Sequence, residues 1–208
     1  MMPIIDTTVY IIDDDFSVLD SLTILLETEG YHVMSFRSAR AFLEAAKPEA
    51  GCLVLDLKMP EMTGLELQER LKAETTVLPI VIITAYGEVR SAVEAMKLGA
   101  FDFIEKPFDD KLLLDTVANA LQHGRVQREK RMARQLAEER LTSLSAREME
   151  VLDMVASGCS SKLIGDKLGI SRRTVEIHRA NIVRKAGTRT LAELLMLARE
   201  AGLGLDVK

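Results

Sequence analysis

The sequence has few of the features that mark secreted, membrane-spanning or repetitive proteins. It contains only two cysteines among 208 residues, Cys52 and Cys159, and they lie far apart, so we expect two reduced thiols rather than a disulfide framework. No apolar run reaches the ~18 residues that span a bilayer. Residues 1–8 lack the basic and apolar regions of a signal peptide. We therefore expect a cytoplasmic protein without a membrane segment.

The charge distribution divides the chain. Its length suits one large domain or two small ones, and its net charge of −5 conceals an acidic front and a basic rear. Residues 1–120 carry a net charge of −11, whereas residues 121–140 and residues 141–208 carry +3 each. The front is suited to holding a cation and the rear to approaching a polyanion, although many solvated surfaces differ in charge by this much.

The front of the chain alternates between strand and helix patterns. Short apolar runs rich in β-branched residues predict strands at 9–12, 31–36, 52–55, 80–83 and 101–104. Amphipathic stretches predict helices at 17–29, 39–46, 64–73 and 88–98, with a fifth helix beginning near residue 110. Five alternating pairs predict an α/β fold, a doubly wound five-stranded parallel sheet of flavodoxin-like order with helices on both faces.

The rear of the chain is predicted to be entirely helical. Residues 125–140 contain no glycine or proline, which favours a helical linker continuous with the fifth helix. Met132 and Leu136, or Val126 and Ala133, could form a short seam with a partner helix, but a solvated helix without a partner fits equally well. We therefore predict three segments, which are a front domain at 1–121, a helical linker at 122–140 and an all-α domain at 141–208.

Local signals mark the helices of the rear domain. Ser145 and Glu148 form a capping box, and the helix that they open is predicted to end at Gly158. A second helix is predicted at 160–168, and a tight turn at 169–171 leads into a third helix with Ser171 as its N-cap. A second capping box, at 190–193, is predicted to open the fourth helix. The second and third helices form a predicted helix-turn-helix.

Acidic side chains follow two of the predicted strands. Asp13 and Asp14 come directly after the first strand, and Asp56 ends the third. Ligands of an open parallel sheet bind outside the carboxyl ends of its strands, where the strand order reverses, so these acids should converge. Converging carboxylates repel unless a cation or a proton joins them. Their oxygen ligands suit Mg²⁺, and a carboxylate beside Mg²⁺ can attack phosphorus.

Two further residues fit phosphoryl chemistry at the same edge of the sheet. Thr84 ends the fourth predicted strand, where its hydroxyl can donate to a phosphoryl oxygen. Lys106 follows the fifth strand, where its ammonium can pair with the same group. Any one of these residues alone would be only a polar strand end. Acids after strands one and three, a hydroxyl after strand four and an amine after strand five together make a specific pattern.

Residues 9–120 resemble a response-regulator receiver domain over nearly their whole length. The matching stretches are IIDDD, LDLKMPEMTG, the run IITA at 82–85, and LGAFDFIEKPF. By this resemblance Asp56 is the phosphoacceptor. The resemblance also implies that Mg²⁺ is bound by Asp14, Asp56 and the backbone carbonyl of Lys58, with Asp13 acting through water.

The same resemblance implies a conformational switch and a phosphate partner. Thr84 and Phe103 would form the switch, Lys106 would pair with the phosphoryl group, and the bond between Lys106 and Pro107 would be cis. Phe103 has no hydroxyl, so a switch step that needs a tyrosine hydrogen bond is absent. Asp15 is an additional acid that we interpret as a solvated N-cap of the first helix.

Residues 141–202 resemble the LuxR/NarL-type DNA-binding domain, particularly the FixJ type. The third helix is then the recognition helix in the major groove. Helical periodicity puts Val175, Ile182 and Val183 on its core face. By resemblance the base-reading positions are Glu176, Ile177 and Ala180, and the backbone contacts are Lys162, Thr174, His178 and Lys185. Cations that could neutralise phosphates are Arg172, Arg173, Arg179, Arg184 and Lys185.

Other interpretations of this helix stay open. Glu176 could pair with Arg172 or Arg173 instead of a base, and His178 could be a packing residue. Two positions depart from the family pattern. Ser161 replaces an asparagine, and Gly165 replaces a helix-favouring alanine at an expected cost of roughly 1 kcal/mol. We expect both departures to affect affinity for DNA more than DNA binding itself.

These features favour a two-component response regulator that is not itself an enzyme. Its expected partners are a sensor histidine kinase, double-stranded DNA, RNA polymerase and, on phosphorylation, a second copy of the chain. A phosphohydrolase that uses an aspartyl phosphate needs an acid two residues after the nucleophile, where Lys58 stands. Two rival functions also stay open, a phosphorylation-independent DNA-binding protein with a degenerate receiver and a nucleoid-type binder with little sequence preference.

Overall fold

The computed structural model describes residues 7–45, 48, 50–73, 78–85 and 89–203. The chain divides into two compact units, Met1–Arg128 and Glu129–Lys208, and each is described by itself. Among the described residues, no helix is both long enough and apolar enough to cross a bilayer. The two cysteines are free thiols, one in each unit, and burial raises the pKa of the Cys52 thiol.

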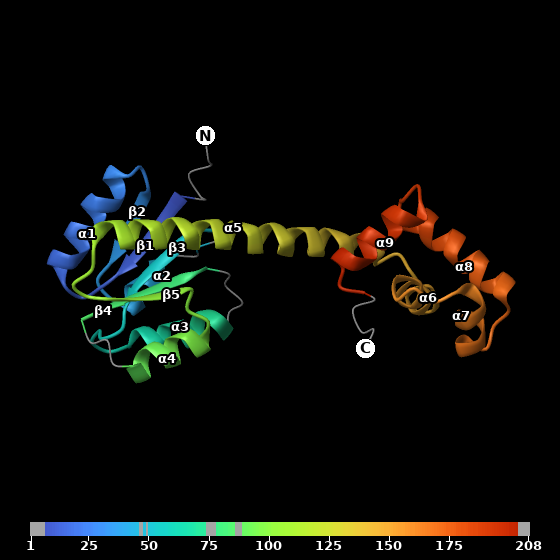
Figure 1. Cartoon of the computed structure of the whole chain (residues 1–208), viewed down its shortest axis with the longest axis horizontal. Coiled ribbons are helices and arrows are strands. Elements are labelled where there is room, and N and C mark those ends of the chain that lie inside the picture. The colour runs from blue at the N-terminus through green and yellow to red at the C-terminus, as the bar shows by residue number, and fades with distance from the viewer. Residues whose placement is uncertain (1–6, 46–47, 49, 74–77, 86–88, 204–208) are drawn as a thin grey trace. The chain divides into compact units, whose positions relative to one another are not determined.

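A five-stranded parallel sheet forms the centre of the first unit (Figure 1). Its strands run in the order β2-β1-β3-β4-β5, which confirms the predicted doubly wound fold. Their bounds are Thr8–Ile12 for β1, His32–Phe36 for β2, Cys52–Asp56 for β3, Ile80–Thr84 for β4 and Asp102–Glu105 for β5. Every residue of β1, β3 and β4 is buried, as parallel strands covered on both faces require.

Helices cover both faces of this sheet, and alternate strand residues separate the two cores. Side chains such as Ile12, Leu55 and Ile82 face helices α2 (Ala39–Ala45), α3 (Gly64–Ala73) and α4 (Val89–Leu98). Their neighbours, such as Ile11 and Val54, face α1 (Phe16–Thr28) and the first half of α5 (Asp110–Leu141). The predicted elements are all present, with ends that differ by a residue or two, apart from positions 46 and 88, which lie outside the described residues.

Helix α5 confirms the predicted continuation of the fifth helix into the linker, because it runs unbroken from Asp110 to Leu141. Leu113, Val117 and Ala120 pack against the sheet in the first unit. Ala137 and Leu141, at the other end of the helix, belong to the core of the second unit. One helix thus contributes apolar residues to both cores.

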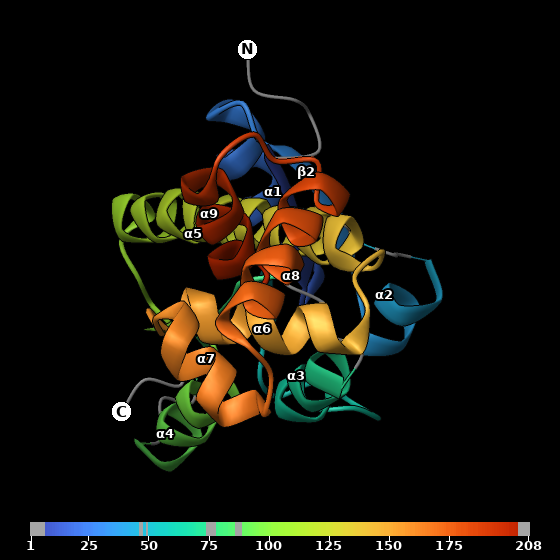
Figure 2. The same cartoon turned by 90° about the vertical axis from the view of Figure 1, so that its right-hand side faces the viewer.

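Helices α6 to α9 form the rest of the described part of the second unit (Figure 2). They are α6 (Ala146–Ala156), α7 (Ser161–Leu168), α8 (Arg172–Lys185) and α9 (Leu191–Glu200). The capping box of Ser145 and Glu148 is confirmed, and so is Ser171 as the N-cap of α8. Their core contains Val151, Leu152, Ile164, Val175, Ile182 and Leu194.

The second predicted capping box, at 190–193, is only half correct. The hydroxyl of Thr190 accepts a hydrogen bond from the backbone N–H of Glu193, as predicted. The carboxylate of Glu193, however, accepts from the N–H of Arg189 rather than from that of Thr190. The extended backbone of Thr190 precedes the helix, and the N–H one residue earlier meets the carboxylate instead.

Candidate acidic site and nucleic-acid interface

Four polar side chains gather at the carboxyl edge of the sheet. Asp13 follows β1, Asp56 ends β3, Thr84 ends β4 and Lys106 follows β5. The first three are almost entirely buried. They reach one edge because parallel strands all end on the same side, and β1 and β3 flank the point where the strand order reverses. Residues from four separate strands are thereby brought into a single site.

A single ammonium group joins the two buried carboxylates. Nζ of Lys106 lies 2.7 Å from Oδ2 of Asp13 and 3.1 Å from Oδ1 of Asp56. The structure therefore brings together three of the residues that the sequence predicted to converge, although 93 positions separate Lys106 from Asp13. Two negative charges face one positive charge, so the site can accept a further cation.

Backbone groups hold the two carboxylates in place. Oδ2 of Asp56 accepts from the N–H of Lys58 at 2.7 Å, and Oδ1 of Asp13 accepts from the N–H of Asp15 at 2.9 Å. Gly64 begins α3 beside the end of β3, where a Cβ atom would lie 2.4 Å from the carbonyl oxygen of Asp56. Only glycine permits this approach, which explains the glycine in the LDLKMPEMTG stretch.

Burial and neighbouring charges shift the pKa values of this site in identifiable ways. Burial raises the pKa of Asp56; the Lys106 ammonium offsets part of that effect and the charge of Asp13 adds to it. Burial by itself would lower the pKa of Lys106, but the hydrogen bonds and charges of Asp13 and Asp56 outweigh it and leave the pKa raised. Lys106 is therefore held as a cation between the two carboxylates.

The other two acids of the DDD run, Asp14 and Asp15, are less buried than Asp13. Asp15 is exposed and caps α1, since its Oδ1 accepts from the N–H of Ser17 at 2.8 Å, which is the arrangement that the sequence suggested. Asp14 is half-buried. Within the described part of the chain, Asp14 forms no ion pair with Lys106, in contrast to Asp13 and Asp56.

The donor set suits a magnesium ion that keeps some of its water. Among the described residues, no three His, Cys, Asp or Glu side chains are gathered closely enough to hold a metal by themselves. Mg²⁺ does not need such a cluster, because it binds through one or two carboxylates and retains several waters. Asp13 and Asp56 converge within hydrogen-bonding distance of one ammonium, so these two acids fit the hard cation that the sequence predicted.

The two predicted switch residues lie on neighbouring strands. Thr84 is completely buried at the end of β4, and its backbone carbonyl accepts from the N–H of Lys106 at 2.8 Å. Phe103 on β5 is half-buried and packs against the core beneath α4. The bond between Lys106 and Pro107 is cis, as the resemblance implied.

In the second unit, α7, a short turn and α8 form the helix-turn-helix. Gly169 ends α7 in the left-handed conformation, and Ser171 caps α8. The sequence suggested that Gly165 only weakens its helix, but the structure gives a packing reason for the glycine. A Cβ atom there would lie 2.7 Å from the backbone carbonyl oxygen of Ile170, so the turn passes too close for alanine. We therefore expect this close approach to outweigh helix propensity at position 165.

Helix α8 presents the predicted base-reading positions to solvent. Val175 and Ile182 are buried in the core, and Val183 packs partly against it. On the opposite face Glu176, Ile177 and Ala180 are exposed. The remaining positions divide into two sets. Lys162, Arg172, Arg173 and Arg184 are exposed, and Thr174 and His178 are half-buried.

Two predicted phosphate contacts instead face their own domain. Nη1 of Arg179 donates to Oγ of Ser161 at 2.8 Å, and the same nitrogen lies 3.8 Å from Oε1 of Glu176. Nζ of Lys185 lies 2.7 Å from Oε2 of Glu148. Glu176 thus pairs with Arg179, whereas the sequence had left open a pair with one of the two preceding arginines. The partners were missed because helical period gives the face of a residue but not its contacts across the fold.

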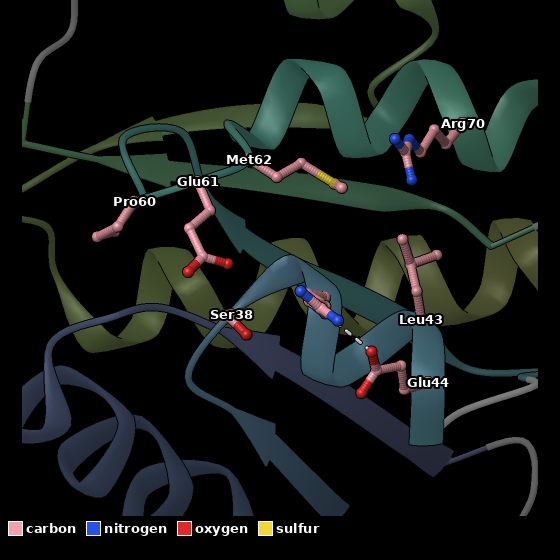
Figure 3. Close-up of a pocket in the computed structure, with 8 residues that line it drawn as sticks. Ser38, Leu43, Glu44, Pro60, Glu61, Met62 and Arg70 are labelled. Carbon is pink, nitrogen blue, oxygen red and sulfur yellow. Dashed lines mark hydrogen bonds and ion pairs between the residues drawn. The ribbon is translucent and has the colours of Figure 1, made fainter.

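The first unit also contains an open cleft that is separate from the acidic site (Figure 3). It has a volume of about 420 Å³ between α2, the loop after β3, and α3. An ion pair of 2.9 Å between Arg40 and Glu44 lies along one wall, and Glu61 and Arg70 extend toward it from the other side. None of the four polar residues at the sheet edge lines this cleft.

Comparisons with known proteins agree with the fold of both units. Residues 9–118 match the family described as response regulator receiver domain, and residues 142–198 match bacterial regulatory proteins of the luxR family. The two matches define a class of protein in which a receiver is joined to a DNA-binding domain. The chain belongs to the response regulators of this class, which regulate transcription and are not enzymes.

Individual relatives narrow this assignment to the FixJ type. The transcriptional regulatory protein FixJ of Bradyrhizobium diazoefficiens is 42% identical over 94% of this chain and 96% of its own length. The transcriptional regulatory protein TdiR of Thauera aromatica is 43% identical over 91% of this chain and 84% of its own.

Solved structures support the same assignment. The response regulator StyR matches with a TM-score of 0.74 and 43% identity, over 93% of this chain and 98% of its own. The crystal structure of full-length FixJ from B. japonicum matches with a TM-score of 0.59 and 42% identity, over 94% of this chain and 97% of its own. The chain is therefore a FixJ-like response regulator.

Proposed function

We propose that a sensor histidine kinase phosphorylates Asp56 and that this modification increases binding of the chain to promoter DNA. The observation that carries the proposal is the sharing of Lys106 between the carboxylates of Asp13 and Asp56. This arrangement supports the proposal, because a carboxylate that could act as nucleophile lies beside an ammonium group and a second carboxylate at one edge of the sheet.

The transfer itself needs little from the protein beyond position and charge. An oxygen of Asp56 forms a bond to phosphorus while the phosphorus–nitrogen bond to the phosphohistidine breaks, and the electron pair leaves with the imidazole. Asp13, Asp14, Asp56 and the backbone carbonyl of Lys58 would hold Mg²⁺. When bound, this ion offsets negative charge on the phosphoryl group. The ammonium of Lys106 pairs with the same group, and the hydroxyl of Thr84 donates to it.

The added charge then shifts the chain between two states. Rearrangement of Thr84 and inward packing of Phe103 would change the surface formed by α4, β5 and α5. That surface would join two copies of the chain, so that two α8 helices meet half-sites about one DNA turn apart. The dimer, acting in the cytoplasm, would recruit or block RNA polymerase at the promoter.

We assign recognition of the DNA bases to the exposed face of α8. The carboxylate of Glu176 would accept from N4 of a cytosine, and Ile177 and Ala180 would contact thymine methyl groups. The exposed cations Lys162, Arg172 and Arg173 would contact phosphates, with Thr174 and His178 as further backbone contacts. Arg179 and Lys185 were also predicted to contact DNA. To reach a phosphate, Arg179 would have to leave Ser161, and Lys185 would have to leave Glu148.

The test compares phosphorylation with DNA binding in the full-length chain. The chain is incubated with acetyl phosphate and Mg²⁺, its intact mass is measured, and its affinity for a duplex selected from a randomised library is determined. Wild type should gain one phosphoryl group and bind more tightly, and Asp56→Asn should do neither. Asp20→Asn, which removes an exposed acid from α1, should behave as wild type.

Two outcomes would overturn the proposal. If Asp56→Asn keeps phosphate-stimulated binding, Asp56 is not the acceptor that controls the DNA-binding domain. If wild type gains no phosphoryl group and binds the duplex equally with and without acetyl phosphate, the receiver is degenerate and DNA binding is independent of phosphorylation.

A further inference from the structure

Arg179 connects the recognition helix to the helix before it. Its guanidinium donates to Oγ of Ser161, the first residue of α7, and faces the carboxylate of Glu176 one turn earlier on α8. The side chain of Arg179 is 25% exposed, whereas that of Glu176 is 50% exposed. The arginine is therefore the inner member of the pair, and the glutamate is the outer one.

We propose that Arg179 is a positioning residue that sets the sequence specificity of the domain, and not one of its phosphate contacts. Arg179 orients and neutralises the carboxylate of Glu176, and Ser161 fixes Arg179. This inference rests on the proposed function, in which Glu176 reads a base.

The geometry makes Ser161 a rigid anchor. Its side chain is buried and belongs to the first turn of α7, so its hydroxyl has little freedom. A guanidinium is planar and carries five N–H donors in a fixed fork, so one short bond restricts the direction of the others. The 2.8 Å bond to Ser161 thereby restricts the orientation of the Arg179 guanidinium.

The longer distance to Glu176 leaves that carboxylate able to read DNA. At 3.8 Å the two groups form an ion pair but are too far apart for a hydrogen bond. Both carboxylate oxygens of Glu176 thus keep lone pairs for the amino group of a cytosine. Arg179 orients the carboxylate by charge without occupying the atoms that recognition uses.

Charge gives a second reason for the pairing. Duplex DNA carries one negative charge per about 1.7 Å of its axis, so an unpaired carboxylate is repelled when it enters the groove. A guanidinium next to Glu176 reduces that repulsion. The energy gained from a correct base pair then depends on Arg179, although Arg179 itself touches neither base nor phosphate.

The test separates a positioning residue from a phosphate contact by two different measurements. The full-length chain is treated with acetyl phosphate and Mg²⁺ and titrated with the selected duplex, with duplexes that carry every single base-pair change in it, and with an unrelated duplex. Each titration is repeated at several salt concentrations. The variants are Arg179→Met, Ser161→Ala, Ser161→Thr and Glu176→Ala, with Arg173→Met as the matched control on the exposed start of α8.

Arg179→Met and Ser161→Ala should lose about tenfold in discrimination at the same base pair as Glu176→Ala. Both should keep the wild-type dependence of affinity on salt, and Ser161→Thr, which retains the hydroxyl, should keep the discrimination. Arg173→Met should weaken binding to all duplexes alike and should reduce the salt slope by about 1. Ser161→Ala keeps the arginine, so the test does not depend on Arg179→Met folding normally.

Two results would overturn the inference, and they differ from each other. If Arg179→Met behaves like Arg173→Met, Arg179 is a phosphate contact, and base reading by Glu176 stands. If Glu176→Ala leaves discrimination unchanged at every base pair, base reading by Glu176 is wrong, and the role of Arg179 fails with it. Loss of phosphate-stimulated binding by Asp56→Asn is unaffected by either result.

Discussion

The ammonium of Lys185 lies 2.7 Å from Oε2 of Glu148, which ties the last turn of α8 to the first turn of α6. The same oxygen accepts from the backbone N–H of Ser145 at 2.8 Å, and the Glu148 side chain is only 5% exposed. The hydrogen bond from Lys185, supported by the N–H of Ser145, lowers the pKa of Glu148 from 4.5 to about 2. A capping residue of α6 therefore also fixes the position of α8.

The first prediction concerns the pH dependence of this domain. Because the pKa of Glu148 is lower in the folded state, its stabilising effect is complete above pH 4.5 and is lost as pH falls toward 2. Glu148→Gln should reduce the free energy of unfolding of residues 129–208 by about 1.5–3 kcal/mol at neutral pH. Thermal denaturation from pH 6 to pH 2 should show the difference between variant and wild type shrinking between roughly pH 4.5 and pH 2.

Glu150→Gln serves as the control for this prediction. Glu150 pairs with Arg147 at 2.7 Å, but its side chain is 52% exposed, so its loss should cost less than about 1 kcal/mol. A difference between Glu148→Gln and wild type that stays constant across the acidic range would contradict the assigned pairing.

The second prediction concerns Gly165, where helix propensity and packing predict opposite changes in the free energy of unfolding for Gly165→Ala. Helix propensity alone predicts that Gly165→Ala stabilises the domain by about 1 kcal/mol. The 2.7 Å approach of an added Cβ to the carbonyl oxygen of Ile170 predicts a loss of about 1–3 kcal/mol instead. Chemical denaturation shows whether Gly165→Ala raises or lowers the free energy of unfolding. Asp166→Ala, the next and exposed position of the same helix, should be neutral or slightly stabilising, and a stabilised Gly165→Ala would refute the packing argument.

The third prediction separates the third acid of the DDD run from the metal ligands. Asp15→Ala should lower the melting temperature of the receiver, because losing an N-cap costs about 1 kcal/mol, whereas Asp15→Asn should keep the cap. Both variants should be phosphorylated by acetyl phosphate at the same Mg²⁺ concentration as wild type. Asp13→Asn is the matched comparison and should require more Mg²⁺. If Asp15→Asn needed as much additional Mg²⁺ as Asp13→Asn, Asp15 would lie at the metal instead.

The fourth prediction concerns a buried amide between α3 and α4. Nε2 of Gln68 donates to the carbonyl oxygen of Ala95 at 3.0 Å, and this oxygen also accepts from the N–H of Ala100. Oε1 of Gln68 is buried and has no hydrogen-bond partner among the described residues. Gln68→Met removes that unsatisfied oxygen and leaves Ala95 paired, so it should change the free energy of unfolding by less than about 1 kcal/mol.

Gln68→Ala is the contrasting variant at this position. It removes the same polar atoms but leaves a cavity, and it should cost about 2 kcal/mol or more in a denaturant titration. Similar losses in both variants would mean that the amide itself, and not the volume of the side chain, holds α4 against α3.

The strands and the acids were predictable because both depend on local pattern and a general rule of parallel sheets. Buried apolar runs identified β1, β3 and β4, and the polar residue after each run identified the functional edge. The continuous helix α5 followed from a stretch without glycine or proline. Element ends differed by a residue or two because caps, such as that of Asp15, decide where a helix begins.

The inward contacts of α8 could not be predicted in the same way. The sequence suggested Arg179 and Lys185 as phosphate contacts, but the partner of Arg179, Ser161, lies 18 positions earlier, and the partner of Lys185 lies 37 positions earlier. Long cationic side chains reach back over a helix surface, so the face of the Cα atom does not decide where the charge lies. The close approach at Gly165 likewise depends on the path of the turn, which spacing alone does not give.

The position of Asp56 at the end of β3 has a mechanical consequence. β3 is the central strand, bonded to β1 on one side and to β4 on the other, and every one of its side chains is buried. Under the proposed function, the carboxylate that would receive the phosphoryl group therefore lies on a buried strand that is hydrogen-bonded on both sides. We therefore expect the response to a phosphoryl group at Asp56 in the residues after the neighbouring strand ends, and not within β3 itself.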